Sequence, residues 1–338
     1  MASMDIGIDL GTSTIMASDY EGRVIVREPS VVAVDLRTDT ILGIGDEVYD
    51  MVGKTPSYIQ VVRPLADGVI SDYKMAEVLM KYLLKKICRN QIVKPRVVIC
   101  VPSGTTSVES QAVTDSALVA GARKVYLIEE PVAAAIGAGI DITRPNGNLI
   151  VDIGGGTCDI AVLSLNGIVC KASTKTAGMR FDEAFVRYAR NTYNLLVGEK
   201  TAEAVKIQIG SVCDQDEECG CDVKGRDLIS GLPKKIPVTR SETLGVFLEP
   251  AWDIVHAVQS VLEKTPPELV GDIRTNGILL TGGGGMMRGL DKLMEEGTHV
   301  PTKVAENAAE CVAVGTAKSF AYLDKLIDGF VDTHAHVH

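Results

Sequence analysis

The sequence lacks any apolar stretch long enough to cross a bilayer. Its longest apolar segments, such as VAAAIGAGI at residues 132–140, fall well short of the roughly 20 residues that a membrane-spanning helix needs. The first residues, MASMDIGIDL, also lack the basic start and the apolar core of a signal peptide. These absences predict a cytoplasmic protein. In that compartment the eight cysteines are expected to be reduced thiols.

The chain also lacks an excess of basic residues and any long basic run. Its formal net charge is −10, from 34 Lys and Arg against 44 Asp and Glu. Binding to nucleic acid requires a basic face, so this charge pattern predicts no nucleic-acid partner. With 338 residues, of which 46% are hydrophobic and 23% charged, the composition is typical of an ordinary α/β protein with two domains.

Two common phosphate-binding motifs are missing as well. The chain has no G-x-x-x-x-G-K-[ST] sequence, which excludes a P-loop protein. It has no G-x-G-x-x-G after a strand with an acid about 20 residues further on, which argues against a Rossmann dinucleotide site. No Pro-rich or Ser-rich linker separates two halves, so a domain boundary has to be inferred from sequence patterns.

An internal repeat of one pattern is present instead. IGIDLGTSTIMASD at residues 6–19 and LIVDIGGGTCDIAVLSL at residues 149–165 share an apolar strand, an Asp, a Gly-containing turn with Thr, and a second apolar strand. Alone, the second stretch could be an ordinary Gly-rich hairpin. The repeat favours two facing turns whose backbone N–H groups bind a phosphate chain. Asp9 and Asp152 hold equivalent places and would lie near a Mg²⁺ ion.

A third glycine run lies in GILLTGGGGMMRGLDKLMEE, residues 277–296. It predicts a buried strand from Gly277 to Thr281, a turn over Gly282–Gly285, and a helix directly after the turn. Such a turn would let a purine and its ribose lie against the backbone.

Three cysteines cluster in SVCDQDEECGCDVKG, at Cys213, Cys219 and Cys221. Their spacing is not the C-x2-C pair of a zinc site, and no fourth ligand is evident, so we favour a solvated acidic loop over a metal site. The final DTHAHVH is interpreted as a frayed terminus rather than a metal chelator.

The order and spacing of these pieces resemble the actin superfamily of ATPases, and within it the bacterial actin homologues of the MreB type. Further stretches typical of these proteins, among them RPLADGVISDY and GRDLISGLPK, extend the resemblance over nearly the whole chain. The five motifs that carry it are DLGTST (9–14), IEEPVAAAIGAG (128–139), DIGGGTCDIAV (152–162), LTGGGG (280–285) and ECVAVGTAK (310–318).

The resemblance implies an α/β, actin-like ATPase fold, in which two RNase-H-like domains flank a nucleotide cleft and each carries a smaller subdomain. The first domain would comprise residues 1–140 plus 318–338, with a small subdomain at about 31–66. The second would comprise residues 141–317, with a small subdomain at about 180–243. The small-residue segments at the two crossings, PVAAAIGAG and AAECVAVGTAK, are expected to pack closely as a hinge.

The resemblance also implies roles for the motif residues. Asp9 and Asp152 would hold Mg²⁺ through water. Glu203 and Lys206 are candidates for ribose or base contacts, although an exposed ion pair between them is an alternative. The turn residues expected to bind phosphates are Gly11, Thr12, Ser13, Gly154, Gly155 and Gly156, and those expected to border adenosine are Gly282, Gly283, Gly284 and Gly285.

Two further residues would serve hydrolysis. Glu130, directly before Pro131, falls where this family positions the attacking water, and Thr157 falls beside the γ-phosphate. Cys158 and Asp159 depart from the Thr-Glu that usually follows that Thr. The shorter acid is expected to retain a polar contact.

The implied function is a weak, assembly-coupled ATPase that uses ATP and Mg²⁺ and polymerises into paired protofilaments of itself. Residues 104–123 are expected to form the helix on the filament-pairing face. Such filaments would lie at the inner face of the plasma membrane and organise cell-wall synthesis and rod shape with the elongation machinery.

Membrane contact is expected at Ile92 and Val93, because the first strand begins too early to leave room for an N-terminal amphipathic helix. The alternatives to a filament protein are a small-molecule kinase of the sugar or acetate type from the same superfamily and a non-filamentous ATP-dependent scaffold.

Overall fold

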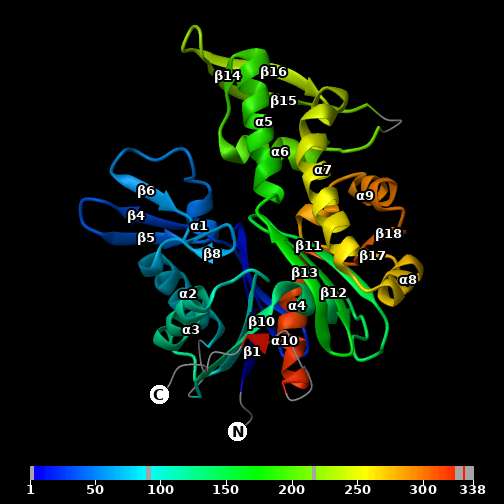
Figure 1. Cartoon of the computed structure of the whole chain (residues 1–338). Coiled ribbons are helices and arrows are strands. Elements are labelled where there is room, and N and C mark those ends of the chain that lie inside the picture. Colours follow the sequence, from blue (N-terminus) through cyan, green and yellow to red (C-terminus); the bar gives the residue numbers. More distant parts are fainter. Residues whose placement is uncertain (1–3, 89–92, 215–217, 324–329, 332–338) are drawn as a thin grey trace.

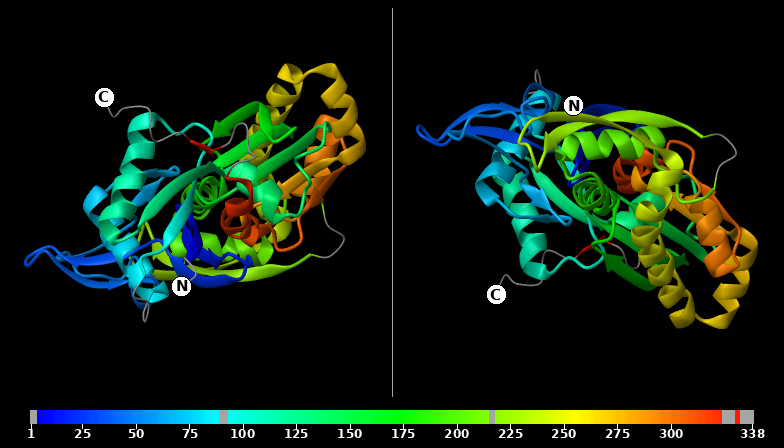
Figure 2. Two further views of the ribbon diagram at one scale, coloured as in Figure 1. Left: turned by 90° about the horizontal axis from the view of Figure 1, so that it is seen from below. Right: turned by 90° about the horizontal axis from the view of Figure 1, so that it is seen from above.

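The computed structural model describes residues 4–88, 93–214, 218–323 and 330–331. The chain forms two α/β halves that lie side by side, each built on one large sheet and extended by a smaller one (Figure 1). Seen from below and from above, the small sheet of the first half projects at one end of the molecule, and helices of the second half form the opposite end (Figure 2). This is the two-domain arrangement that the sequence predicts.

The first half is built on a six-stranded sheet in the order β19-β10-β9-β1-β2-β3. β9, RVVICV, is apolar and buried after Arg96 because helices cover both faces of the sheet. Val97 and Ile99 pack in the core with α2 and α3, and Val98 and Cys100 pack with α4 (Glu130–Gly137). The elements are β1 (Asp5–Leu10), β2 (Thr14–Asp19), β3 (Val24–Pro29), β9 (Arg96–Val101), β10 (Lys124–Glu129), β19 (Phe330–Val331), α2 (Tyr73–Ile87) and α3 (Ser107–Ala120).

The second half is built on a five-stranded sheet in the order β13-β12-β11-β17-β18. All seven residues of β12 are buried, because Ile160 and Val162 face the core under α7 while Ala161 and Leu163 face α4. The elements are β11 (Asn148–Ile153), β12 (Cys158–Ser164), β13 (Gly167–Thr174), β17 (Ile278–Thr281), β18 (Thr302–Val304), α7 (Arg240–Lys264), α8 (Pro267–Asn276), α9 (Leu290–Thr298), and the 3₁₀ turns η1 (Gly284–Met286) and η2 (Ala308–Glu310).

The repeat read from the sequence is present as two matching three-stranded units. β1, β2 and β3 form an antiparallel meander, and so do β11, β12 and β13. The first strand of each unit also pairs in parallel with a strand from elsewhere in its half, β9 for β1 and β17 for β11. Asp9 and Asp152 therefore occupy matching places near the ends of the first strands.

The chain crosses between the halves through α4 (Glu130–Gly137) and α10 (Cys311–Lys318), and η3 (Ser319–Tyr322) follows the second crossing. The two helices are in close backbone contact. A Cβ added at Gly315 would lie 1.7 Å from the Ala133 carbonyl oxygen, and one at Gly137 would lie 1.8 Å from the Cys311 carbonyl oxygen. The prediction that these small-residue segments pack closely is confirmed. The domain boundaries at 140/141 and 317/318 stay predictions.

Each large sheet carries a smaller unit on the same side of the molecule (Figure 1). The order of the small sheet is β5-β4-β6 in the first half and β14-β15-β16 in the second. The first unit contains β4 (Val32–Asp35), β5 (Thr40–Ile44), α1 (Asp46–Tyr49) and β6 (Ile59–Val62), followed by the hairpin of β7 (Leu65–Ala66) and β8 (Val69–Ile70). The second contains α5 (Gly178–Tyr193), β14 (Leu195–Leu196), α6 (Glu199–Ile209), β15 (Gly220–Asp227) and β16 (Pro233–Thr239).

Three local predictions can be compared with these elements. The helix expected within 104–123 is α3, which begins with a capping box of Thr106 and Glu109 and ends before Gly121 at a φ of 114°. The helix expected directly after Gly285 is wrong in position, because a 3₁₀ turn follows and α9 begins only at Leu290. No described helix is both long and apolar enough to cross a membrane.

The cysteine-rich segment differs from its prediction. Cys221 lies in β15, and both Cys219 and Cys221 are partly buried against the core of the second half. A solvated loop is therefore wrong for this part of the segment, because the alternation of β15 turns Cys221 inwards and Cys219, just before the strand, packs against the same core. Among the described residues no three His, Cys, Asp or Glu side chains gather closely enough to hold a metal ion.

Candidate functional site

A cavity of about 290 Å³ lies between the two halves. It is lined by both glycine turns, by the first residue of α4 and by residues of α6 and α10. All of the predicted site residues line it except Gly285, which is buried behind the turn against Leu280. They are Asp9, Gly11, Thr12, Ser13, Glu130, Asp152, Gly154, Gly155, Gly156, Thr157, Glu203, Lys206, Gly282, Gly283 and Gly284.

The two hairpin turns face each other so closely that side chains would collide. A Cβ added at Gly155 would lie 2.2 Å from Ser13 Oγ, and one at Gly156 would lie 2.5 Å from Thr12 Oγ1. Glycine is required at these two places because real Cβ atoms do not approach other atoms so closely. The turns expose backbone to the cavity from both halves, which is the arrangement expected of a phosphate cradle.

The first turn is held from behind by Ser30. Its buried hydroxyl donates to the Gly11 carbonyl oxygen at 2.6 Å, and its backbone N–H donates to the Ser13 carbonyl oxygen at 3.0 Å. The second turn closes through the Gly154 N–H, which donates to the Thr157 carbonyl oxygen at 2.8 Å. Both turns are therefore fixed in place by hydrogen bonds within the protein.

The two equivalent aspartates lie at the floor of the cavity. Asp152 is buried and accepts a hydrogen bond from Thr281 Oγ1 at 2.7 Å, and desolvation raises its pKa to about 7. Asp9 accepts a hydrogen bond from Cys100 Sγ at 3.3 Å, and desolvation raises its pKa to about 6. Two desolvated carboxylates beside a phosphate cradle suit a hard cation with oxygen ligands, such as Mg²⁺.

Glu130 and Asp159 form a second acidic pair. Glu130 is buried at the start of α4, where desolvation and the neighbouring carboxyl groups, Asp159 foremost, raise its pKa well above the usual range. Desolvation also raises the pKa of Asp159, whose Oδ1 accepts a hydrogen bond from the Ser103 N–H at 2.7 Å. Asp159 thus makes a polar contact, as expected for this shorter acid. The contact joins the two halves, because Asp159 lies in β12 and Ser103 follows β9.

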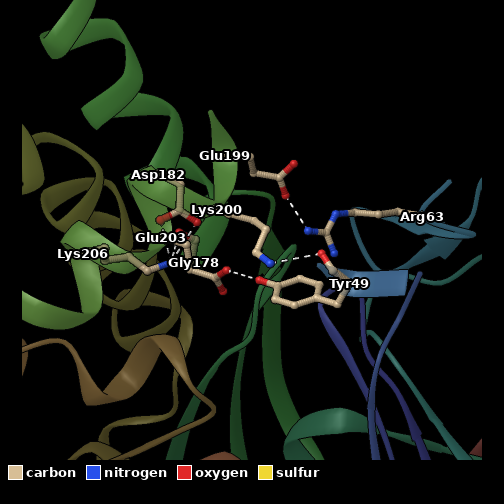
Figure 3. A network of polar contacts seen from close by, with 8 residues as sticks. All are labelled: Tyr49, Arg63, Gly178, Asp182, Glu199, Lys200, Glu203 and Lys206. Carbon is tan, nitrogen blue, oxygen red and sulfur yellow. Dashed lines mark hydrogen bonds and ion pairs between the residues drawn. The ribbon is translucent and has the colours of Figure 1, made fainter. Parts of the chain in front are cut away.

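On the other side of the cavity, α6 presents Glu203 and Lys206 (Figure 3). Lys206 Nζ donates to Asp182 Oδ2 and to the Gly178 carbonyl oxygen, each at 2.9 Å. Glu203 Oε2 accepts a hydrogen bond from the hydroxyl of Tyr49 at 2.5 Å. Each residue therefore has a partner other than its helix neighbour, in contrast to the alternative of an ion pair between the two.

Sequence reasoning missed several residues of the lining. Gly68 has a φ of 78°, its N–H donates to Thr12 Oγ1 at 3.1 Å, and a Cβ there would lie 2.8 Å from Thr157 Cγ2. The Asp-Gly turn in RPLADGVISDY was the available signal, but the turn alone does not indicate what it faces. The other missed lining residues are Leu10, Thr14, Met16, Arg27, Gly178, Ile207, Ala309 and Val312.

The comparisons with known proteins agree with this fold. The family described as MreB/Mbl protein matches residues 3–328. The cell shape-determining protein Mbl of Bacillus cereus is 44% identical over 327 residues, covering 96% of this chain and 98% of the relative. The cell shape-determining protein MreB of Escherichia coli K12 is 43% identical over 332 residues, covering 96% and 95%.

A solved structure of the same family has the same fold. MreB5 of Spiroplasma citri, in a crystal structure bound to ADP, superposes with a TM-score of 0.90 at 40% identity, covering 96% of this chain and 97% of that one. The predicted actin-like fold is thereby confirmed. With a family match over nearly its whole length and two curated relatives above 40% identity, this chain belongs to the MreB/Mbl family.

Proposed function

We propose that this protein is a bacterial actin that binds and hydrolyses ATP, assembles into filaments of itself and helps to determine cell shape. The observation that carries the proposal is the pair of glycine turns that face each other across the cleft, each preceded by an aspartate. Family membership supports it, because curated relatives are named cell shape-determining proteins.

The nucleotide would lie in the cavity between the halves. Crystal structures of Spiroplasma citri MreB5 hold ADP or AMPPNP, and we extend nucleotide binding from that relative to this chain. The turns at Gly11–Ser13 and Gly154–Gly156 would bind the phosphates through backbone N–H groups. Asp9 and Asp152 would hold Mg²⁺ through water, and the ion would neutralise charge on the phosphate oxygens.

Glu130 is the candidate for positioning the attacking water. It lines the cavity together with Thr157, and it comes from the crossing helix α4 rather than from either sheet. Phosphoryl transfer depends mainly on positioning and electrostatic stabilisation, which suits a side chain whose place changes with the angle between the halves. We therefore assign hydrolysis to the closed, assembled protein.

The small-molecule kinase is the weaker candidate. The cavity shows nothing that favours a second substrate, and the family that matches the chain is MreB/Mbl. Weak ATPase activity that accompanies assembly gives a role to Asp9, Glu130 and Asp152 in the cleft with water as the phosphate acceptor, so no second substrate is needed.

Association with the plasma membrane and with the cell-wall elongation machinery is part of the proposal. Val93 lies between α2 and β9, whereas Ile92 lies outside the described residues. Burying two aliphatic side chains in lipid contributes roughly 3 to 5 kcal/mol at most. Ile92→Ser with Val93→Ser should therefore reduce flotation with anionic liposomes, and equal flotation of variant and parent would remove this loop as the anchor.

The experiment that tests the proposal is pelleting of the purified protein with ATP and Mg²⁺, together with electron microscopy. Paired filaments that require nucleotide are expected, and Asp152→Ala should pellet far less because the metal position is lost. Protein that stays dispersed with ATP would contradict the filament proposal. Transfer of phosphate from ATP to an added sugar would favour the kinase instead.

A further inference from the structure

A second set of contacts joins the two halves away from the phosphate turns, between α6 and the small unit of the first half (Figure 3). The Tyr49 hydroxyl donates to Glu203 Oε2 at 2.5 Å. Arg63 Nη2 lies 2.5 Å from Glu199 Oε1. The two acids are four residues apart and so lie on one face of α6, which faces the first half.

Lys200 lies between these two contacts. Its Nζ donates to the Tyr49 carbonyl oxygen at 3.1 Å and to Asp50 Oδ1 at 2.8 Å, and it lies 4.2 Å from the centroid of the Tyr49 ring. Asp50 is 89% exposed, so its ion pair is expected to contribute little. The ammonium over the ring instead fixes the tyrosine whose hydroxyl reaches Glu203.

We infer that these contacts form a latch that holds the mouth of the cleft closed over a bound nucleotide and sets the rate at which the nucleotide leaves. The latch consists of the pairs Tyr49–Glu203 and Arg63–Glu199, with Lys200 holding the Tyr49 ring in place. The inference rests on the proposed function, because a latch over an empty cleft would have nothing to retain.

The latch lies at the edge of the cavity. Glu203 lines the cavity, whereas Tyr49, Arg63 and Glu199 are not among its lining residues. Loss of the Tyr49 hydroxyl or of the Arg63 charge therefore removes no direct contact with a ligand in the cavity. An effect of the Arg63 change on nucleotide release therefore has to act through closure of the cleft, whereas loss of the Tyr49 hydroxyl also frees Glu203, which lines the cavity.

The same helix also supports the second phosphate turn. One turn beyond Glu203, Lys206 donates to the Gly178 carbonyl oxygen at 2.9 Å. The Gly178 N–H in turn donates to the Gly154 carbonyl oxygen at 3.0 Å, and the Met179 N–H donates to the Gly155 carbonyl oxygen at 2.8 Å. Release of the latch would free α6 to move. Because Lys206 of α6 holds Gly178, and Gly178 and Met179 bond the turn at Gly154–Gly156, movement of α6 would be passed on to that turn.

The first test measures release of radiolabelled ADP, with Mg²⁺ present, after a chase with excess unlabelled ADP. Unmodified ADP avoids a label on the ribose near Glu203, and the full-length protein is kept below its assembly concentration. Tyr49→Phe keeps the ring and should release ADP roughly tenfold faster, the effect expected from losing one hydrogen bond to a charged group. Tyr58→Phe is the matched control, because Tyr58 is an exposed tyrosine of the same small unit that stacks on Arg37.

The second test exchanges the charges of the ion pair. Arg63→Glu places two acids together and should speed ADP release by roughly threefold to fivefold, as expected for a half-exposed pair. The double variant Arg63→Glu with Glu199→Arg restores opposite charges and should return release to within about twofold of the parent. Restoration in the double variant would show that the pair acts as a unit.

The outcomes separate the latch from the proposed function. If the parent retains ADP but Tyr49→Phe and Arg63→Glu release it at the parent rate, the latch is overturned and nucleotide binding stands. Equal acceleration in Tyr49→Phe and Tyr58→Phe would also overturn it, since the effect would then not depend on the contact with Glu203. If the parent itself binds no ADP, the proposed function is overturned and the latch with it.

Discussion

Buried Glu130 and Asp152 line the cleft together with Asp9, and Asp159 is fully buried next to Glu130. Desolvation raises the pKa of each carboxyl group, and the charges of its neighbours add to this for Glu130 and Asp152. Such a group disfavours folding when it ionises, because the unfolded chain hydrates the charge better. The site residues thus reduce stability in the absence of a ligand, as is common where function requires buried charge.

Asp152→Asn should stabilise the nucleotide-free protein, and more so at high pH. The folded pKa of Asp152 is about 7, above the ordinary value of 3.8, so the folded state holds the proton more tightly and stability is lost as pH rises between these values. Asparagine removes this loss and can still accept from Thr281. By the linkage relation the gain is about 4 kcal/mol at pH 8 and below about 1 kcal/mol at pH 4.

Urea unfolding at several pH values without nucleotide would measure this gain. Asp253→Asn is a suitable control, because Asp253 is an exposed residue of α7 outside the cavity and its replacement should leave the stability close to that of the parent. A gain from Asp152→Asn that is the same at pH 4 and pH 8 would contradict the assignment of a raised pKa.

Glu130→Ala should bind ATP and assemble but hydrolyse roughly 10² to 10³-fold more slowly, the usual loss for a group that orients or activates the attacking water. The expectation follows from the place of Glu130 in the cavity lining beside Thr157. Release of phosphate from preassembled filaments in a single turnover would measure it. Hydrolysis at the parent rate would exclude this role for Glu130.

At the scale of secondary-structure elements, the site depends on two hairpin turns that meet without side chains between them. Gly155→Ala should weaken nucleotide binding, because the added Cβ would lie 2.2 Å from Ser13 Oγ and 2.9 Å from Ser13 Cβ. Overpacking of this kind costs about 1–3 kcal/mol, which corresponds to a roughly fivefold to 150-fold loss of affinity if the cost falls on the bound state.

Isothermal titration with ADP and Mg²⁺ would measure the affinity of Gly155→Ala. Gly245→Ala is the matched control, because that glycine lies in α7 with open space around its missing Cβ and alanine is favoured within helices. Parent-like affinity in Gly155→Ala would mean that the turns can separate without harm to the site.

The elements differ in how far the sequence reveals them. The hairpins that carry Asp9 and Asp152 could be predicted, because the strand pattern, the acid and the glycines are neighbours in the chain. The contact of Tyr49 with Glu203 joins residues 154 positions apart, and nothing in the local pattern of either residue indicates it. The late start of α9 was missed because GGGGMM fits a helix start, while the positive φ of Gly289 delays it.

At the scale of the whole molecule, the described chain passes between the halves only through the neighbourhoods of α4 and α10. Gly315→Ala should destabilise both halves together, because its Cβ would lie 1.7 Å from the Ala133 carbonyl oxygen, a backbone atom that cannot rotate away. A loss of about 3 kcal/mol or more is expected from such overpacking.

Urea unfolding followed by circular dichroism would measure the loss in Gly315→Ala, with Gly271→Ala in α8 as the control that has free space. An unchanged midpoint in Gly315→Ala would show that the two helices can move apart freely.

The packing of α4 on α10 also determines where movement is amplified. The first residue of α4, Glu130, and Val312 of α10 both line the cavity, so its floor lies beside the pivot, whereas Tyr49 and Glu203 meet at the mouth. In a lever, displacement grows with distance from the fulcrum. A small rotation about α4 and α10 would shift the two glycine turns much less than the two mouth residues, so the contact between Tyr49 and Glu203 would break well before the turns separate.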